Sequence, residues 1–162
     1  MRMKEIEIGT IMLSDNVFVS DPSYDTDTWC TLNLKGVMSG NYYCKVKKAN
    51  CGSWGNRVKE LIVIHESIKD AKKSIRWEYV DSICVDSGQM GIYDYEHFSQ
   101  IDADYERKEE WYDKVCGITL TDAYGIVDTQ SVVSSSGYGD GRYPIYINKT
   151  DDLITAIKVV FI

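Results

Sequence analysis

The chain has 162 residues and 44% hydrophobic content, which is enough for one ordinary core and too little for two. Its 25 acidic and 18 basic side chains give a net charge of −7, and that balance disfavours the phosphate backbone of a nucleic acid. No apolar run approaches the ~20 residues that cross a bilayer. We therefore expect a single domain over residues 1–162, with no nucleic acid and no membrane as a partner.

Alternation of apolar and polar residues predicts strands through the first half of the chain. Strands are expected at residues 5–12, 17–19, 29–34, 41–47 and 58–65. In the first of these strands, one face would carry Ile6, Ile8, Thr10 and Met12. The last strand is apolar throughout residues 61–64, which is typical of a central strand buried on both faces.

The second half mixes helix and strand signals. One or two helical turns are expected at residues 67–74, and a longer amphipathic helix at 102–116, capped by Asp102 or Asp104. Strands are expected at residues 83–85, 125–133, 142–148 and 153–161. The core face of the final strand would carry Leu153, Thr155, Ile157, Val159 and Phe161. The predicted class is α+β, predominantly antiparallel β in a sandwich or partly open barrel, with one or two short helices.

The cysteines and the first residues bear on the compartment. The five cysteines are irregularly spaced without a Cys-x-x-Cys pair, which is typical of reduced, mostly buried thiols and not of a disulfide framework or a zinc site. The first eight residues carry acids and lack the apolar core of a signal peptide. We therefore expect a cytoplasmic protein.

Sequence motifs of known catalytic sites are absent, including Gly-x-Ser-x-Gly, the phosphate-binding Gly-x-x-x-x-Gly-Lys and His-Glu-x-x-His. His65 and His97 are interpreted as packed or surface side chains, and a nucleophilic pair of Cys84 with His65 is a minor hypothesis. The loop that carries Asp21 and two further aspartates offers oxygens suited to calcium. Ordinary turn formation explains these aspartates equally well and is the favoured interpretation.

Two glycine-rich segments are more distinctive. Residues 85–91 (Val-Asp-Ser-Gly-Gln-Met-Gly) and 136–144 (Ser-Gly-Tyr-Gly-Asp-Gly-Arg-Tyr-Pro) combine glycines with carboxylates, hydroxyls and aromatic rings. Glycines in such segments permit left-handed backbone and close approach, either for a tight hairpin or for a bound ligand. The residues that we expect at a ligand site are Asp21, Tyr24, Asp86, Ser87, Tyr138, Asp140, Arg142 and Tyr143.

Four segments taken together resemble a bacterial family, the domain of unknown function 4241. They are residues 19–22 (Val-Ser-Asp-Pro), 40–42 (Gly-Asn-Tyr), 85–88 (Val-Asp-Ser-Gly) and 137–144 (Gly-Tyr-Gly-Asp-Gly-Arg-Tyr-Pro). The resemblance extends from about residue 13 to residue 161 and implies a shared fold without implying a reaction. This chain departs from the family pattern by carrying Tyr138 in place of Trp and by ending its last strand in Val160 and Phe161 instead of Asp-Phe.

Three functions remain open. Twelve tyrosines and four tryptophans favour a non-enzymatic binding protein, sequestering a small nucleotide-like ligand in a prokaryotic or phage setting, with Tyr138 or Tyr143 stacking and Arg142 donating hydrogen bonds. The alternative is a protein-interaction module of the inhibitor or immunity type, whose acidic surface attracts a basic partner. The second alternative is a divalent-metal-dependent hydrolase that uses Asp21, Asp86 and Asp140. The sequence leaves the cofactor unknown, and edge strands make a homo-oligomer reasonable.

Overall fold

The computed structural model describes residues 3–70 and 75–162. The protein is α+β with mostly antiparallel strands, in two sheets that do not close into a barrel, so the predicted class is confirmed. The larger sheet contains, in spatial order, β1 (Met3–Leu13), β4 (Gly40–Asn50), β5 (Asn56–His65), β11 (Leu153–Val160), β10 (Gly141–Thr150) and β6 (Glu78–Val85). The smaller sheet contains β3 (Leu32–Lys35), β2 (Asn16–Ser20), β7 (Gln89–Asp94), β9 (Ser131–Ser135) and β8 (Tyr124–Asp128).

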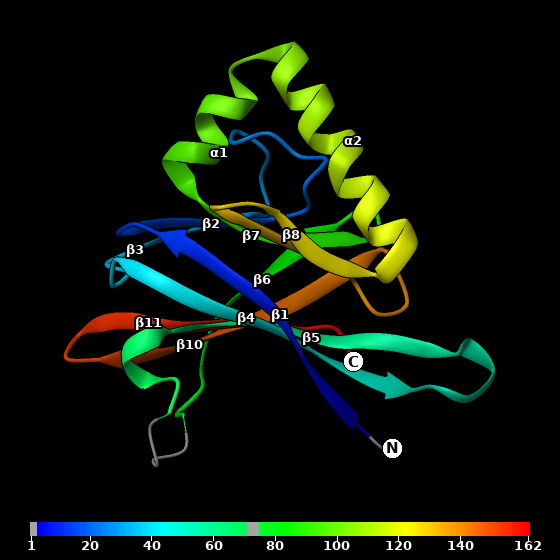
Figure 1. Ribbon diagram of the computed structural model, residues 1–162, viewed down its shortest axis with the longest axis horizontal. Coiled ribbons are helices and arrows are strands. Elements are labelled where there is room, and N and C mark those ends of the chain that lie inside the picture. The colour runs from blue at the N-terminus through cyan, green and yellow to red at the C-terminus, as the bar shows by residue number, and fades with distance from the viewer. Residues whose placement is uncertain (1–2, 71–74) are drawn as a thin grey trace.

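Two helices, α1 (Tyr95–Asp102) and α2 (Tyr105–Asp122), cover the outer face of the smaller sheet and form a third layer (Figure 1). The main core lies between the sheets, where Val17, Ile92 and Val132 pack in one cluster with Val63 and Ile157. A second core lies between the smaller sheet and the helices; it includes Phe18, Tyr93, Phe98, Ile101, Trp111, Val115, Val127 and Val133. The apolar strand β5 is central in its sheet and buried, as its sequence predicts.

Aspartates cap both helices. Asp94 accepts a hydrogen bond from the His97 amide at the start of α1, and Asp104 accepts one from the Arg107 amide at the start of α2. Of the two predicted caps for the longer helix, Asp104 is therefore the one used. The helix continues past Cys116 to Asp122 and ends where Ala123 adopts a left-handed conformation, with a φ of 69°.

β-Bulges reverse part of the predicted core faces. The register of β1 against β4 shifts between Glu7 and Gly9, so that Ile11 is buried whereas Thr10 and Met12 are exposed. The prediction that Thr10 and Met12 share the face of Ile6 is therefore wrong. One extra residue in a pattern of period two moves every later side chain to the other face.

The same effect occurs in β11. Its register against β10 shifts beside Thr155, and as a result Ile154 joins the main core while Leu153 is exposed. The prediction that Leu153 faces the core is therefore wrong. The expectation for Ile157 and Val159, which lie beyond the bulge, is confirmed.

Several predicted boundaries also change. β3 begins at Leu32, so Trp29 lies in the preceding loop and is not part of a strand. The strand predicted at residues 125–133 is two strands, β8 and β9, joined by a turn in which the Gln130 amide donates to Asp128. A short 3-10 turn at Glu66–Ile68 stands where helical turns were expected at 67–74, and residues 71–74 lie outside the described part of the chain.

The prediction of five reduced thiols is wrong for two of them. Cys30, in the loop before β3, and Cys84, in β6, form a disulfide across 54 residues of sequence. Their spacing gives no signal for this pair, because the two cysteines meet only when the loop folds against the edge of the larger sheet. Cys44 is free and buried, while Cys51 and Cys116 are free and half-buried.

Part of the larger sheet projects beyond the other two layers. Figure 1 shows the first half of β1 and the hairpin of β4 and β5 extending past the smaller sheet and the helices. We call this projecting part, residues 3–6 and 48–58, the arm. Within the described residues, no helix is both long enough and apolar enough to span a membrane.

Candidate functional site

Asp21 is the hub of the segments that the sequence singled out. Its side chain is completely buried, and its Oδ1 accepts hydrogen bonds from the Ser23 amide at 2.8 Å and hydroxyl at 2.7 Å and from the Ser87 hydroxyl at 2.6 Å. Its Oδ2 accepts from the Asp86 amide at 2.8 Å and the Ser87 amide at 2.7 Å. Five internal donors occupy this carboxylate, so it fastens the 21–24 loop to the 85–88 turn and has little capacity left for a ligand.

Tyr24 and Asp86 lie together beside this hub. The Tyr24 hydroxyl donates a hydrogen bond to the Asp86 carboxylate. Partial burial and that hydrogen bond raise the pKa of Tyr24, and the negative charges of Asp21 and Asp140 add to the rise. Five of the eight predicted site residues are therefore close in space: Asp21, Tyr24, Asp86, Ser87 and Asp140.

The second glycine segment, residues 136–141, lies against the first and forms a self-contained turn. The Ser136 amide donates to the Gly88 carbonyl at 3.0 Å, and the Tyr143 hydroxyl donates to the carbonyls of Ser136 and Gly139 at 3.2 and 2.6 Å. Gly139 adopts a φ of 118°, a conformation that favours glycine. Tyr143 thus holds the turn together, which is the structural interpretation of this motif.

Tyr138 and Arg142 do not join the cluster. Tyr138 packs edge-to-face on Trp54 of the arm, with ring centroids 5.7 Å apart, and the neighbouring Cys51 side chain raises its pKa. Arg142 is exposed and pairs across the sheet with Cys84 through the backbone. The combination of a stacking Tyr138 or Tyr143 with the Arg142 guanidinium at one ligand therefore stays a prediction.

The hypothesis of a Cys84–His65 nucleophilic pair fails, and the aspartate loop makes the contacts of an ordinary turn. Cys84 is bound to Cys30, and His65 instead contacts the Ser67 hydroxyl at 2.7 Å and the Ser39 carbonyl at 3.0 Å. Asp25 accepts from the Asp27 amide and the Thr28 hydroxyl, as expected for an ordinary turn. Across residues 3–70 and 75–162, no group of three or more His, Cys, Asp or Glu side chains is placed to hold a metal ion.

His97 has a structural role. Its Nε2 lies 2.9 Å from Asp128 Oδ2, which also accepts from Trp111 Nε1 at 3.1 Å. Burial raises the pKa of Asp128, but the hydrogen bonds from His97 and from the Gln130 amide outweigh burial and leave that pKa below its ordinary value. This carboxylate joins α1 and α2 to the end of β8, and the interpretation of His97 as a packed residue is confirmed.

A groove that the sequence did not suggest runs along α2. Two hollows, of about 250 and 210 Å³, lie on either side of Tyr112. Gln89 forms part of the floor: its amide donates to the hydroxyls of Ser87 and Tyr112 at 3.2 Å each and accepts from Thr119 at 2.6 Å. The available signal was a second stripe on α2, since Tyr105 and Cys116 lie outside the core cluster while Tyr112 packs against its edge.

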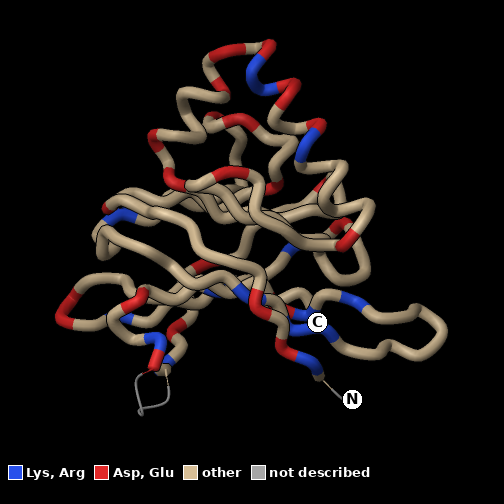
Figure 2. The backbone as a smooth tube through the Cα atoms, in the orientation of Figure 1, with Lys and Arg blue, Asp and Glu red and all other residues tan. Residues whose placement is uncertain are grey.

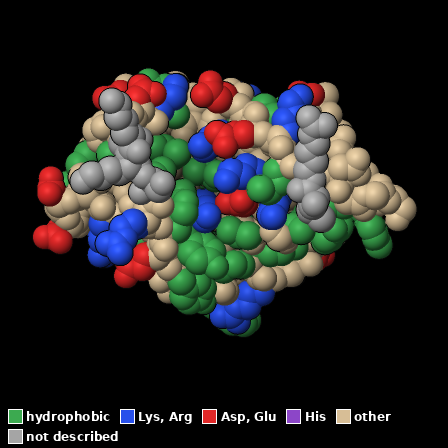
Figure 3. Space-filling view, turned by 90° about the horizontal axis from the view of Figure 1, so that it is seen from below, with side chains coloured by type: hydrophobic (Ala, Val, Ile, Leu, Met, Phe, Trp, Pro, Cys, Tyr) green, Lys and Arg blue, Asp and Glu red, His purple; other side chains and the backbone are tan. Residues whose placement is uncertain are grey.

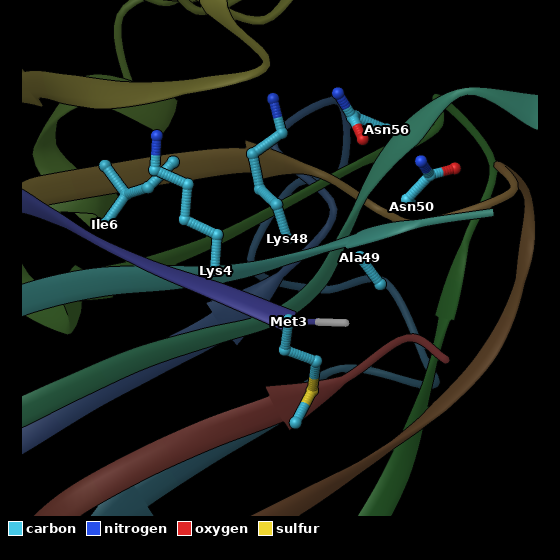
Figure 4. A pocket seen from close by; sticks show the side chains of 7 residues that line it. All are labelled: Met3, Lys4, Ile6, Lys48, Ala49, Asn50 and Asn56. Carbon is cyan, nitrogen blue, oxygen red and sulfur yellow. The ribbon is translucent and has the colours of Figure 1, made fainter. Parts of the chain in front are cut away.

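Another hollow lies on the arm, also outside the predicted site. It has a volume of about 590 Å³ and is lined by Met3, Lys4, Ile6, Lys48, Ala49, Asn50 and Asn56. Lys4 and Lys48 are directly opposite each other across β1 and β4, and Asn50 is opposite Asn56 across β4 and β5. Figure 4 shows the side chains of Lys4, Lys48 and Asn56 extending from the same face of the sheet. This face continues the core face beyond the point where the smaller sheet ends.

Lys4 and Lys48 differ from the other lysines of the same strands. Lys45 and Lys47 lie on the opposite, outer face of the sheet and pair with Glu5 at 2.8 Å and Glu60 at 3.8 Å. Figure 3 views the molecule from the side of this outer face, and basic and acidic side chains lie next to one another there. Among the described residues, neither Lys4 nor Lys48 has a carboxylate within 4.0 Å; the Lys48 ammonium lies 5.8 Å from the centre of the Tyr124 ring.

A signal for the arm site was present in the sequence. Gly52 and Gly55 predict a turn, and a hairpin about that turn places the two asparagines on either side of it. In the structure the side-chain oxygen of Asn50 accepts a hydrogen bond from the backbone amide of Gly52 at 2.9 Å. The side-chain NH2 group of Asn50 takes no part in that bond. What the sequence did not reveal is that Lys4 would be paired with Lys48, because the register of β1 depends on its bulge.

Comparison of the chain with family models, with curated proteins and with solved structures finds no match in any of the three. The similarity to the domain of unknown function 4241 therefore stays a prediction that rests on four sequence segments. The site must be interpreted from its own chemistry: a basic hollow on the arm, an internally satisfied hub at Asp21 and a groove along α2.

Proposed function

We propose that the protein is a non-enzymatic binding protein that holds a small anionic, nucleotide-like ligand in the hollow of the arm. The observation that carries the proposal is the direct cross-strand pairing of Lys4 with Lys48. Like charges in that arrangement repel each other and destabilise a sheet. An anion between the two ammonium groups would remove the repulsion and gain charge-assisted hydrogen bonds from both.

The size and the remaining polar groups of the hollow suit such a ligand. A volume of about 590 Å³ falls within the range of small-molecule sites, roughly 300–1,000 Å³. The two asparagine side chains supply neutral donors beside the lysines, and Ile6 supplies apolar surface. Lysine binds phosphate as a point charge, so the arrangement favours a phosphate or carboxylate without dictating its orientation.

An aromatic surface lies at the tip of the same hairpin. Trp54 occupies the turn between Asn50 and Asn56, and its ring contacts that of Tyr138. Both rings are more than half exposed. Neither ring lines the hollow itself, but Trp54 follows Asn50 and precedes Asn56, which do, and exposed aromatic rings stack on planar ligands such as nucleobases. This is the reason to propose a nucleotide-like ligand and not a simple inorganic anion, and it retains a binding role for Tyr138.

The test is a calorimetric titration of the protein with ATP, pyrophosphate and adenosine. We expect ATP to bind the wild type and Lys48→Ala to weaken that binding about tenfold or more, since a hydrogen bond to a charged group is worth about 1.5–3 kcal/mol. The matched control is Lys45→Ala, which removes a lysine three residues earlier on the opposite face and should leave the affinity unchanged.

Two further comparisons make the test sharper. Trp54→Ala should weaken ATP but not pyrophosphate if the ring stacks on the base. Adenosine should bind far more weakly than ATP because it lacks the phosphates. Failure of both ATP and pyrophosphate to bind the wild type, or equal loss in Lys48→Ala and Lys45→Ala, would contradict the proposed site.

A further inference from the structure

We infer that the groove along α2 is a docking surface for a basic segment of a partner protein that carries two apolar anchor residues. This surface is separate from the hollow of the arm, and the inference does not depend on the proposed ligand. It rests on the shape of the groove, on exposed apolar side chains at its two ends and on the charge of the layer around it.

The groove consists of two hollows that lie along one side of α2 and meet at Tyr112. Tyr105, Tyr112, Cys116 and Leu120 lie along it at spacings of seven, four and four residues, which places them on one face of the helix. Its opposite wall comes from the segments fastened by Asp21, including Ser23 and the 87–89 turn. Hollows of about 250 and 210 Å³ are large enough to accept a side chain and too small for a typical small-molecule site.

Large apolar side chains project at the two ends of this groove. Tyr105 is 81% exposed and Leu120 is 86% exposed. They are separated by fifteen residues, which corresponds to roughly 22 Å along the helix. The loop beside the helices adds Trp29, which is 79% exposed. Neither Tyr105 nor Leu120 belongs to a core cluster, so folding does not require either side chain.

The charge around the groove selects the kind of partner. Loop 21–31 and residues 95–122, which contain both helices and the link between them, carry eleven acidic residues and three basic ones, so the net negative charge of the chain is concentrated there. Figure 2 shows acidic positions along this layer. Such a surface attracts and orients a basic partner. A second copy of the chain would bring the same negative charge to the interface, which argues against self-association through this face.

The occupant is therefore a lysine- or arginine-rich segment in which two apolar residues lie about 22 Å apart, one for each end of the groove. Its cations would face Glu109 on the groove wall, while Lys108, which lines the same hollow, is already paired with Asp102 at 2.9 Å. Charge brings the segment to the surface and the apolar anchors give it a defined position, since exposed ion pairs alone contribute little affinity.

The test uses a synthetic amphipathic peptide of lysine and leucine, about eighteen residues long, followed by fluorescence anisotropy at physiological salt. We expect the double variant Tyr105→Ser with Leu120→Ser to bind the peptide at least tenfold more weakly than the wild type. Its net charge is unchanged, and both side chains are exposed, so the fold should persist. The control is Tyr79→Ser, an exposed tyrosine in β6, which should alter the affinity less than twofold.

Two results would overturn the inference. Equal binding of the peptide by the wild type and by the double variant would mean that attraction is purely electrostatic and that no docking site exists. A wild-type dimer in sedimentation velocity that the double variant abolishes would assign the face to a second copy of the chain. The arm variants provide an independent check, because Lys48→Ala should not change peptide binding.

Discussion

The helical layer and the arm differ in whether their charged side chains have partners. Around the helices, buried or half-buried carboxylates are saturated: Asp21 accepts five hydrogen bonds, and Asp128 accepts from His97, Trp111 and a backbone amide. On the arm, two lysines oppose each other with no acidic partner among the described residues. Groups that satisfy one another hold a fold together, whereas groups left with a mutual repulsion are available to a ligand.

The two regions also differ in charge. The helical layer and its loop carry a large excess of acid, whereas the remainder of the chain has fourteen acids and fifteen bases. A net charge of −7 thus describes only one side of the molecule. The net charge disfavours anionic partners on the acidic side of the molecule. It does not do so on the arm, where basic side chains outnumber acidic ones.

The largest expected effect follows from removal of the Asp21 hub. Asp21→Ala leaves three backbone amides and two hydroxyls without their acceptor, and all of these hydrogen bonds are at least partly buried. We expect the free energy of unfolding to fall by about 3 kcal/mol or more, measured by urea denaturation. Asp27→Ala in the same exposed loop is the control and should change it by less than about 0.5 kcal/mol. A neutral effect of Asp21→Ala would mean that this carboxylate is not the structural hub described here.

The disulfide gives the next effect. Cys30 and Cys84 close a long loop, and loss of such a bond typically costs about 2–4 kcal/mol. Cys30→Ser should therefore lower the free energy of unfolding by that amount under oxidising conditions. Thiol titration of the unfolded, unreduced wild type should detect the three free cysteines, Cys44, Cys51 and Cys116. Detection of all five thiols, or no effect of the substitution, would disprove the bond.

A smaller effect is expected from Asp128. Its pKa in the folded state lies below the ordinary value of 3.8, so it contributes stability above that pH and loses the contribution as the pH falls through the lower folded value. Asp128→Asn should reduce the free energy of unfolding by about 1 kcal/mol at pH 7. The difference from the wild type should shrink below about pH 3.8 as the wild-type carboxyl gains its proton. A difference that is constant with pH would contradict this role.

Fold class and most strands could be predicted from the sequence because they depend on local patterns. The apolar run of β5 and the cap at Asp104 are both local signals, and the structure confirms them. The faces of β1 and β11 could not be predicted, since a bulge changes the phase without leaving a mark in a pattern of period two. The Cys30–Cys84 bond is likewise a consequence of tertiary folding.

The candidate site was predicted only in part. The sequence predicted one site that contains Asp21, Tyr24 and Asp86, and these residues are in contact in the structure. Glycine and Asp-Pro segments indicate positions where two backbone segments approach each other closely. It could not distinguish a carboxylate that binds its own backbone from one that faces a ligand. The pairing of Lys4 with Lys48 was hidden for the reason that hid the core face of β1: it is a property of register and not of composition.

The most direct test of the central claim is the thermal unfolding of Lys48→Ala, measured with and without ATP. The claim predicts opposite signs: without ATP the variant should be more stable than the wild type by about 0.2–1 kcal/mol, because a repulsion between like charges is gone. With ATP, the melting temperature of the wild type should rise, whereas that of the variant should rise little. A variant that is less stable without ATP and gains as much as the wild type with it would show that the arm lysines serve the fold and not a ligand.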